Sequence, residues 1–364
     1  MRIVDVRADH FRIPLPVVLS DSTHGEMTHF ELITVRLRSD SGEQGLGYTY
    51  TTGVGGAAIY MMIVKDLTPV LLRADPLCID YLWERMWWRL HFVGRGGAAA
   101  FAISAVDIAL WDMKARHAGK PLWRMLGGCT NRVKAYAGGI DLHFTVGELC
   151  EQTKAFLDQG FCAIKMKVGR DRLSEDIERV RAVRNLIGPD VPLMVDANMA
   201  WSVDQAIRAA RVLADYDIYW LEEPTVPDDI EGHARIAREG GLPIATGENL
   251  HTLYEFQKMI SSGGVLFPEP DMANIGGITA WMKVAYLAQA HNLPVTSHGV
   301  HDLHVHLLAA VPNASYLEIH GFGLERFTKQ PLHLEDGEAI APERLGHGVE
   351  LDWEALEPYR EKRK

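Results

Sequence analysis

The sequence has no apolar run of about 20 residues, and its N-terminus lacks a basic region followed by an apolar one. It therefore predicts neither a membrane-spanning helix nor a signal peptide, and we expect a cytoplasmic protein. None of the four cysteines has the CxxC spacing, so reduced structural thiols are expected. Basic residues are in deficit, 37 Lys and Arg against 48 Asp and Glu, and the net charge of −11 argues against nucleic acid and anionic membranes as partners.

The length of 364 residues suits a barrel of about 250 residues together with a smaller domain. Residues 1–40 alternate in the manner of strands, and a turn containing glycine leads to a third run at 45–53, which indicates an antiparallel sheet. Helical periodicity follows at 57–119. We therefore predict an α+β capping domain over residues 1–125. The polar stretch near residues 20–29 predicts a mobile lid loop.

Short apolar runs alternate with amphipathic segments over residues 126–320, a pattern typical of βα units and a parallel sheet. The predicted fold class is therefore α/β, a modified (β/α) barrel of the TIM type with an N-terminal α+β cap. Residues 321–364 contain short β-like runs and are expected to pack back on the capping domain. Eight strand candidates fit the barrel: residues 133–138, 162–167, 191–196, 217–222, 242–247, 265–270, 293–297 and 315–319.

Three carboxylates close successive strand candidates at equal spacing. Asp196, Glu222 and Glu248 each follow an apolar run, and they lie 26 residues apart, about one βα repeat. Because the carboxyl ends of parallel strands share one mouth of a barrel, the three side chains are expected to converge there. Three oxygen ligands suit a hard cation, Mg²⁺ above all, and without a cation at least one carboxyl would be protonated. The alternative is that they are separate helix caps or ion-pair partners.

Basic side chains occupy other strand ends of the same mouth. Lys165 and Lys167 lie two residues apart, so both side chains leave one face of the strand. Next to a metal ion each ammonium should have a lowered pKa, which makes a lysine a usable base; the alternative is a solvated pair. Asp271 and His298 follow neighbouring candidates, so the carboxylate can fix the tautomer of the ring. Glu318 closes the last candidate and could donate or accept a hydrogen bond.

The motifs KMK, VDAN, EEP, GEN, PD…GG, SH and LE occur in the order seen in the enolase superfamily, and the chain resembles its mandelate racemase subgroup over nearly its whole length. The resemblance implies that Asp196, Glu222 and Glu248 bind one Mg²⁺ per subunit. It implies that Lys167, and His298 with Asp271, are the two acid/base groups. The other residues that it places in the site contact the substrate or its enolate: Lys165, Asn198 and Glu318.

Within the subgroup, the stretches SDSTHGEMTHFELITV, GYTYTTG, VGRGG and AYAGGIDL are similar to acid-sugar dehydratases of the talarate/galactarate kind and to 3,6-anhydro-galactonate cycloisomerases. The lid stretch of mandelate racemase itself is apolar, whereas this one is polar, which suggests a polyhydroxylated substrate. The candidate substrate contacts on the cap are His24 and Tyr50.

The resemblance implies a Mg²⁺-dependent acid-sugar dehydratase, which removes the proton α to a carboxylate and eliminates the β-oxygen to give a 2-keto-3-deoxy acid. The alternatives are a cycloisomerase that opens a 3,6-anhydro ring by the same elimination, and a racemase or epimerase of a 2-hydroxy acid. A homo-oligomer is expected. A hydrolase using His304 and His306 is disfavoured, because residues i and i+2 of a helix point apart. A non-catalytic binding barrel is the remaining alternative.

Overall fold

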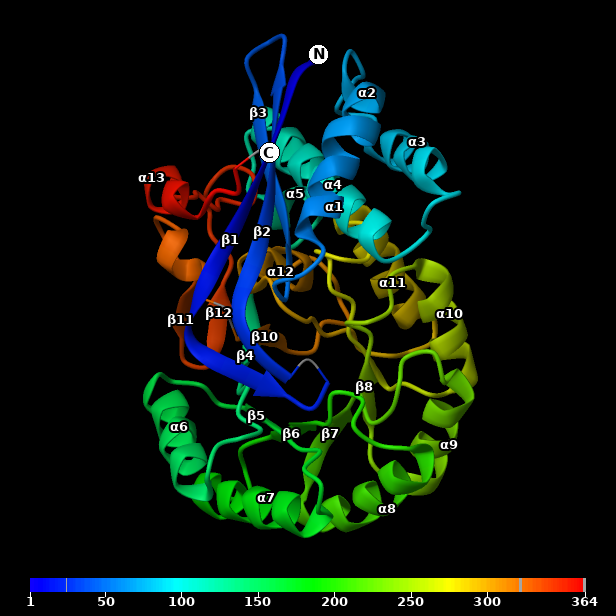
Figure 1. Ribbon diagram of the computed structural model, residues 1–364, viewed down its shortest axis with the longest axis vertical. Helices are drawn as coiled ribbons and strands as arrows, with labels where there is room; N and C mark the ends of the chain where they lie inside the picture. Colours follow the sequence, from blue (N-terminus) through cyan, green and yellow to red (C-terminus); the bar gives the residue numbers. More distant parts are fainter. Residues whose placement is uncertain (24, 321–322, 363–364) are drawn as a thin grey trace.

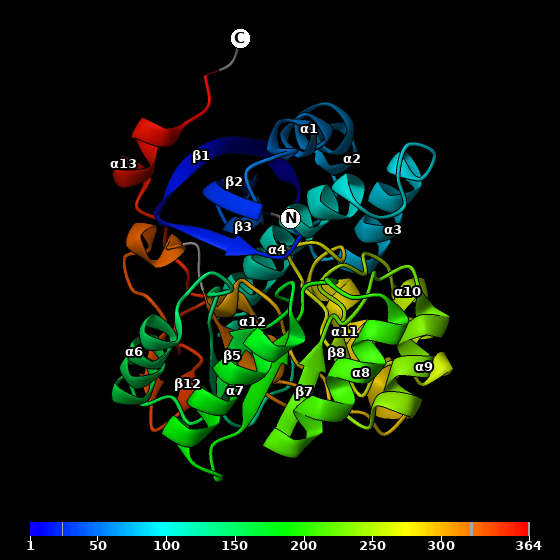
Figure 2. The same cartoon turned by 60° about the horizontal axis from the view of Figure 1, so that its bottom comes forward.

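The computed structural model describes residues 1–23, 25–320 and 323–362, and it confirms the predicted barrel with an N-terminal α+β cap. Figure 1 shows the first sheet in front of one end of the ring of barrel strands. Figure 2 shows the cap stacked on the barrel. Within the described residues, no helix is long and apolar enough to cross a membrane.

The cap contains an antiparallel sheet whose buried face carries apolar residues from neighbouring strands, such as the paired Phe11 and Leu32. Helix α4 (Ala98–His117) packs against this sheet at Gly47, where a Cβ would lie 2.2 Å from the carbonyl oxygen of Ala105. Glycine therefore allows the close approach of helix and sheet. The strand order is β1 (Ile3–Asp21), β2 (Gly25–Ser39) and β3 (Gln44–Thr51).

Residues 20, 21 and 25–29 belong to strands and not to the loop that their polarity predicts. β1 and β2 stay paired as far as Asp21 opposite Gly25, so the stretch is the end of a two-stranded ribbon. A strand ladder uses backbone groups, which polar residues supply as well as apolar ones. The end of the ribbon is also fixed to the barrel, because the hydroxyl of Ser22 donates to the carbonyl oxygen of Asn198 at 3.0 Å. The described part of the predicted lid is therefore the end of a hairpin in contact with the barrel, and its mobility stays a prediction.

Helices complete the cap. Pro69, which has no backbone N–H, lies where the π-helical turn η1 passes into the next helix. The helical elements before and after α4 are α1 (Gly56–Met61), η1 (Met62–Leu67), α2 (Thr68–Leu71), α3 (Ile79–Leu90) and α5 (Leu122–Met125).

The barrel consists of parallel strands with helices around the outside of the ring, and β10 pairs with β4 (Figure 1). Two helices begin with a capping box, in which Thr145 or Ser202 accepts from a backbone N–H of the first turn. The strands are β4 (Arg132–Gly138), β5 (Ile164–Lys167), β6 (Leu193–Asp196), β7 (Ile218–Glu222), β8 (Ile244–Thr246), β9 (Phe267–Pro268) and β10 (Leu317–Ile319). The helices are α6 (Val146–Asp158), α7 (Leu173–Ile187), α8 (Val203–Leu213), η2 (Ala214–Tyr216), α9 (Ile230–Gly240), α10 (Leu253–Ser262), α11 (Ile278–Ala290) and α12 (His301–Leu308).

The seventh strand candidate, residues 293–297, departs from the prediction. Val295 forms an isolated bridge with Ala314, and the N–H of Thr296 bonds to a carbonyl oxygen of β9. Pro294 has no N–H to donate, which prevents a longer ladder. The chain nevertheless follows the path of a barrel strand between β9 and β10.

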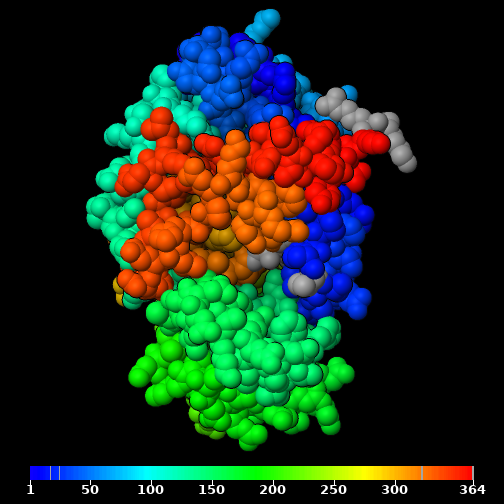
Figure 3. Space-filling model, turned by 90° about the vertical axis from the view of Figure 1, so that its left-hand side faces the viewer, coloured from blue at the N-terminus to red at the C-terminus, as the bar shows by residue number. Residues whose placement is uncertain are grey.

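The C-terminal residues divide between the two domains, whereas the prediction placed them on the cap alone. The hairpin of β11 (His333–Glu335) and β12 (Glu338–Ile340) extends the barrel sheet, because the first half of β4 offers a free edge to β12. After η3 (Leu324–Phe327), α13 (Trp353–Leu356) and η4 (Glu357–Tyr359), the chain reaches β1 of the cap. Figure 3 shows this orange and red segment across the seam between the blue cap and the green barrel.

A buried carboxyl joins the cap to the barrel. Asp107 on α4 accepts hydrogen bonds from the backbone N–H of Thr279 at 2.9 Å and from its hydroxyl at 2.7 Å, in the first turn of α11. Gly277 makes room for this contact, because a Cβ there would lie 2.4 Å from a carboxylate oxygen of Asp107. Burial raises the pKa of Asp107 to about 7.

Asp107→Asn is expected to make stability less dependent on pH. Because folding raises the pKa of Asp107 from 3.8 to about 7, the carboxyl contributes stability that is complete at low pH and is lost as the pH rises through about 7. From pH 6 to pH 8 the free energy of unfolding of the wild type should fall by about 1 kcal/mol relative to that of the variant, because the amide of the variant carries no charge. Urea unfolding at both pH values measures this difference. The same change in both proteins would contradict the assignment.

Candidate active site

Three buried carboxylates meet at the mouth of the barrel. Asp196 and Glu222 end the paired strands β6 and β7, and Glu248 lies just after β8. Their ligand oxygens all lie within 4.8 Å of one another, so the alternative of separate caps is excluded. Burial raises the pKa of Glu222 to about 8, and the neighbouring carboxylates Asp196 and Glu248 add to the effect. A divalent cation would remove this repulsion, and the all-oxygen donor set fits Mg²⁺.

The two lysines of β5 reach the same carboxylates. The Nζ atom of Lys165 lies 2.5 Å from Glu222 Oε1 and 2.6 Å from Glu318 Oε1. The Nζ atom of Lys167 lies 2.5 Å from Asp196 Oδ2. Burial acts to lower the pKa of Lys167, but the combined attraction of Asp196, Glu248 and Glu222 raises it. The lowering expected next to a metal ion stays a prediction, because it depends on the cation as well as on these carboxylates.

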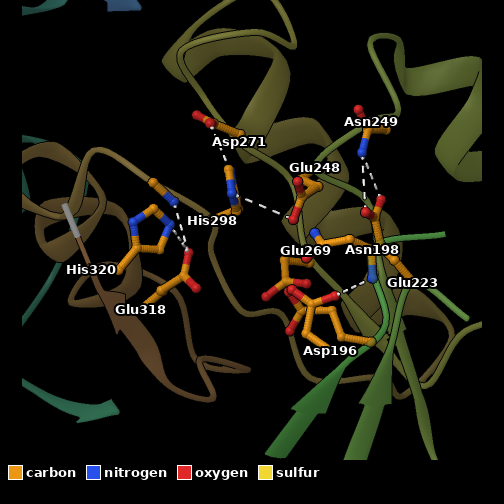
Figure 4. Close-up of polar contacts among 12 residues, drawn as sticks. Asp196, Asn198, Glu223, Glu248, Asn249, Glu269, Asp271, His298, Glu318 and His320 are labelled. Atoms are coloured by element: carbon orange, nitrogen blue, oxygen red, sulfur yellow. Dashed lines mark hydrogen bonds and ion pairs between the residues drawn. The ribbon is translucent and has the colours of Figure 1, made fainter. Parts of the chain in front are cut away.

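A histidine also reaches the carboxylate cluster. His298 Nδ1 lies 3.1 Å from Asp271 Oδ2, and its Nε2 lies 3.4 Å from Glu248 Oε2 (Figure 4). Burial acts against the charged ring, but Glu248 and Asp271 raise the pKa of His298. Since a carboxylate only accepts hydrogen bonds, Nδ1 carries a proton and donates it to Asp271. Nε2 then faces the carboxylate cluster.

Glu318 is surrounded by donors. Besides Lys165, the backbone N–H of Gly299 donates to its Oε2 at 3.0 Å, and His320 Nε2 lies 3.0 Å from the same oxygen. Burial acts to raise the pKa of Glu318, but His320 and Lys165 lower it. The side chain is therefore a carboxylate and accepts hydrogen bonds rather than donating them.

The residues expected to contact substrate differ in their placement. Asn198 lies at the mouth, and its side-chain oxygen has no hydrogen-bond partner among the described residues. Tyr50 donates its hydroxyl to Asp271 at 2.9 Å, and its contact with substrate stays a prediction. His24 lies outside the described residues. His304 and His306 are buried in α12, and neither belongs to a metal-binding group in the part of the chain that is described.

Sequence reasoning missed three side chains around the site. His320 had a signal, because a residue two positions after Glu318 on a strand shares its face. Glu269 is fully buried, and its Oε2 has no partner among the described residues; burial and Glu222 raise its pKa. Arg179 on α7 donates to the carbonyl oxygen of Lys167 at 2.6 Å and so holds the end of β5. Glu269 directly follows β9, so its place at a strand end was a signal, whereas Arg179 lies on a helix and had none.

This fold and this arrangement of carboxylates, lysines and histidine define the class of protein. A family model for the N-terminal domain of mandelate racemase and muconate lactonizing enzyme matches residues 1–127, and one for an enolase C-terminal domain-like barrel matches residues 148–355. The chain belongs to the mandelate racemase and muconate lactonizing enzyme group of the enolase superfamily, as the motifs predicted.

Individual relatives are similar over nearly the whole chain. A 3,6-anhydro-α-L-galactonate cycloisomerase of Streptomyces coelicolor is 58% identical over 351 residues, covering 96% of this chain and 97% of that protein. An L-talarate/galactarate dehydratase of Salmonella typhimurium is 37% identical over 350 residues, covering 94% of this chain and 87% of that protein.

Solved structures show the same likeness. The structure of a racemase from Streptomyces coelicolor A3(2) with bound magnesium matches with a TM-score of 0.96 and 56% identity, covering 98% of this chain and 99% of that one. An L-talarate dehydratase from Polaromonas, in complex with Mg and L-glucarate, matches with a TM-score of 0.94 and 35% identity, covering 99% of this chain and 98% of that one.

Proposed function

We propose that the protein is a Mg²⁺-dependent cycloisomerase that opens a 3,6-anhydro-galactonate ring by β-elimination. The observation that carries the proposal is that Lys167 contacts Asp196 and His298 contacts Glu248, two different members of one buried carboxylate cluster. The 58% identity to a cycloisomerase favours ring opening. Dehydration of an acid sugar, ranked first from the sequence, is the second candidate, and the similarity to talarate/galactarate dehydratases supports it.

The charge distribution suits the ionisation of a carbon acid. Bound by Asp196, Glu222 and Glu248, Mg²⁺ would supply positive charge that favours the enediolate over the less charged carboxylate. Lys165 adds an ammonium group for the substrate carboxylate, and Glu318 orients that ammonium. Glu318 thus acts through Lys165, whereas the resemblance implied a direct hydrogen bond to the enolate.

Lys167 and His298 divide the proton transfers. One of them, in its neutral form, takes the α-proton onto Nζ or Nε2. The electrons of the broken C–H bond form the C=C bond of the enol, while the β-carbon–oxygen bond breaks and its electron pair leaves with the oxygen. The other group, in its acid form, protonates that oxygen. The enol then takes a proton at the β-carbon and becomes a 2-keto-3-deoxy acid.

Product analysis tests the proposal. The protein with Mg²⁺ in D₂O is incubated with mono- and diacid sugars and with their 3,6-anhydro derivatives, and NMR and mass spectra are recorded. An anhydro sugar acid is expected to give a keto acid of unchanged composition. A product lighter by one water from an open-chain acid would identify a dehydratase. Exchange of the α-proton without a keto acid would identify a racemase or epimerase. No exchange and no product with any acid would refute the enzyme assignment.

We also propose that the protein is a homo-oligomer. Large apolar side chains are exposed on one surface around α3 and α10, among them Trp88, Phe92 and Tyr254. The same surface carries both Glu84 and Arg95, so a second copy could pair charges of opposite sign across a two-fold axis. Light scattering that gives the 40.6 kDa mass of one chain would contradict this proposal.

A further inference from the structure

A hydroxyl group from the cap reaches the acid/base pair of the barrel. Tyr50 lies near the end of β3, and its hydroxyl donates to Asp271 Oδ2 at 2.9 Å. The same hydroxyl oxygen lies 3.4 Å from His298 Nδ1. One carboxylate oxygen of Asp271 therefore accepts from two donors, one on each domain.

Thr49, which precedes Tyr50 on β3, contacts the loop that follows Asp271. The hydroxyl of Thr49 donates to the carbonyl oxygen of Ala273 at 2.6 Å. The N–H of Ala273 in turn donates to Asp271 Oδ1 at 2.7 Å. Both oxygens of the Asp271 carboxylate are thus fixed by contacts that lead back to consecutive residues of the cap.

A glycine leaves the space that the hydroxyl of Tyr50 occupies. Gly299 has a φ of 61°, and a Cβ at this position would lie 2.4 Å from the hydroxyl oxygen of Tyr50 and 3.1 Å from Asp271 Oδ2. A side chain at residue 299 would therefore displace the hydroxyl or the carboxylate. Burial and the charge of Asp271 raise the pKa of Tyr50, so the hydroxyl keeps its proton and remains a donor.

We propose that Tyr50 is a positioning residue of the acid/base machinery: its hydroxyl holds Asp271 so that His298 keeps its proton on Nδ1 and points Nε2 into the mouth. The effect of Tyr50 on catalysis rests on the proposed function. A carboxylate released from one donor can rotate, and the imidazole then loses the contact that fixes its tautomer.

The chain offers a matched control. Tyr48 lies two residues earlier on β3 and is fully buried, and its hydroxyl has no hydrogen-bond partner among the described residues. Tyr48→Phe and Tyr50→Phe therefore remove the same atom from the same strand. Only the second change takes a donor from Asp271, so the difference between the two variants reports the contacts of the Tyr50 hydroxyl.

Kinetics of the Mg²⁺-loaded variants give the first readout. Tyr50→Phe is expected to lower kcat by about 10- to 100-fold, with KM changed by less than about twofold. Tyr48→Phe should leave both quantities unchanged. The other titratable groups facing the ring of His298 are common to both variants: Glu248, His304, Glu318 and His320.

Nitrogen-15 NMR of His298 in the Mg²⁺-loaded protein gives a second readout that needs no turnover. The Nδ1 proton should be retained in the wild type and in Tyr48→Phe, and lost or broadened by exchange in Tyr50→Phe. Wild-type kcat together with an unchanged Nδ1 signal in Tyr50→Phe would overturn the proposal. If no sugar acid is turned over but the Nδ1 signal is lost, the positioning role stands and the proposed function fails.

Discussion

Lys167→Ala is expected to lower kcat by about 10³-fold or more while the protein stays folded, and His298→Asn should do the same. Lys167 contacts Asp196 and His298 contacts Glu248, so the two side chains reach different parts of the cluster and neither should take over the proton transfer of the other. Elimination needs both a base for the α-proton and an acid for the leaving oxygen. Removal of either group is therefore expected to lower kcat rather than to weaken substrate binding.

Steady-state kinetics and circular dichroism on both variants check this prediction. Lys134→Ala and His291→Asn serve as controls, because they remove the same kinds of group from exposed positions of the barrel. The controls should keep wild-type activity. Full turnover by Lys167→Ala and by His298→Asn would disprove the assignment of two acid/base groups.

Removal of divalent cations by a chelator and dialysis is expected to lower activity by about three orders of magnitude, and added Mg²⁺ should restore it. Asp196, Glu222 and Glu248 are buried, and burial with mutual repulsion is unfavourable for three carboxylates unless a cation offsets it. The lysines of β5 compensate part of this charge. A free Mg²⁺ concentration of 100 times the Kd should raise the free energy of unfolding by about 2.7 kcal/mol.

Thermal unfolding with and without Mg²⁺ measures the second part of this prediction. Asp196→Asn supplies the comparison, because it removes one ligand charge and should abolish most of the thermal shift. Activity that survives chelation would contradict the metal assignment. Activity restored better by Zn²⁺ than by Mg²⁺ would favour a hydrolase.

The barrel and its strand-end groups could be predicted because they follow local periodicity. Carboxylates recur with the βα repeat in Asp196, Glu222 and Glu248, and the alternation of a strand puts Lys165 and Lys167 on one face. Residues 293–297 are an exception: they contain a proline and follow the path of a strand, but they form only an isolated bridge and not a ladder of hydrogen bonds. Periodicity reports which face a residue occupies, and this was enough to bring the metal ligands together.

Contacts between the domains could not be predicted in this way. Tyr50 and Asp271 lie 221 positions apart, and no spacing rule links them, so Tyr50 was assigned to the substrate. Residues 20–29 were assigned to a loop because polarity does not reveal that the backbone stays paired. The pKa of Lys167 depends on the 2.5 Å distance between its Nζ atom and Asp196 Oδ2, which the sequence does not give.

The end of the chain has a consequence for the order of assembly during protein synthesis. β1 is an edge strand of the cap, and Arg360 and Glu361 bond to it at Phe11 and His10. The partners Asp9 and Arg360 are 351 positions apart, so a ribosome makes the whole barrel before this edge is covered. Until then the first strand leaves unpaired backbone groups open to other chains, and the nascent protein is most exposed to aggregation during that interval.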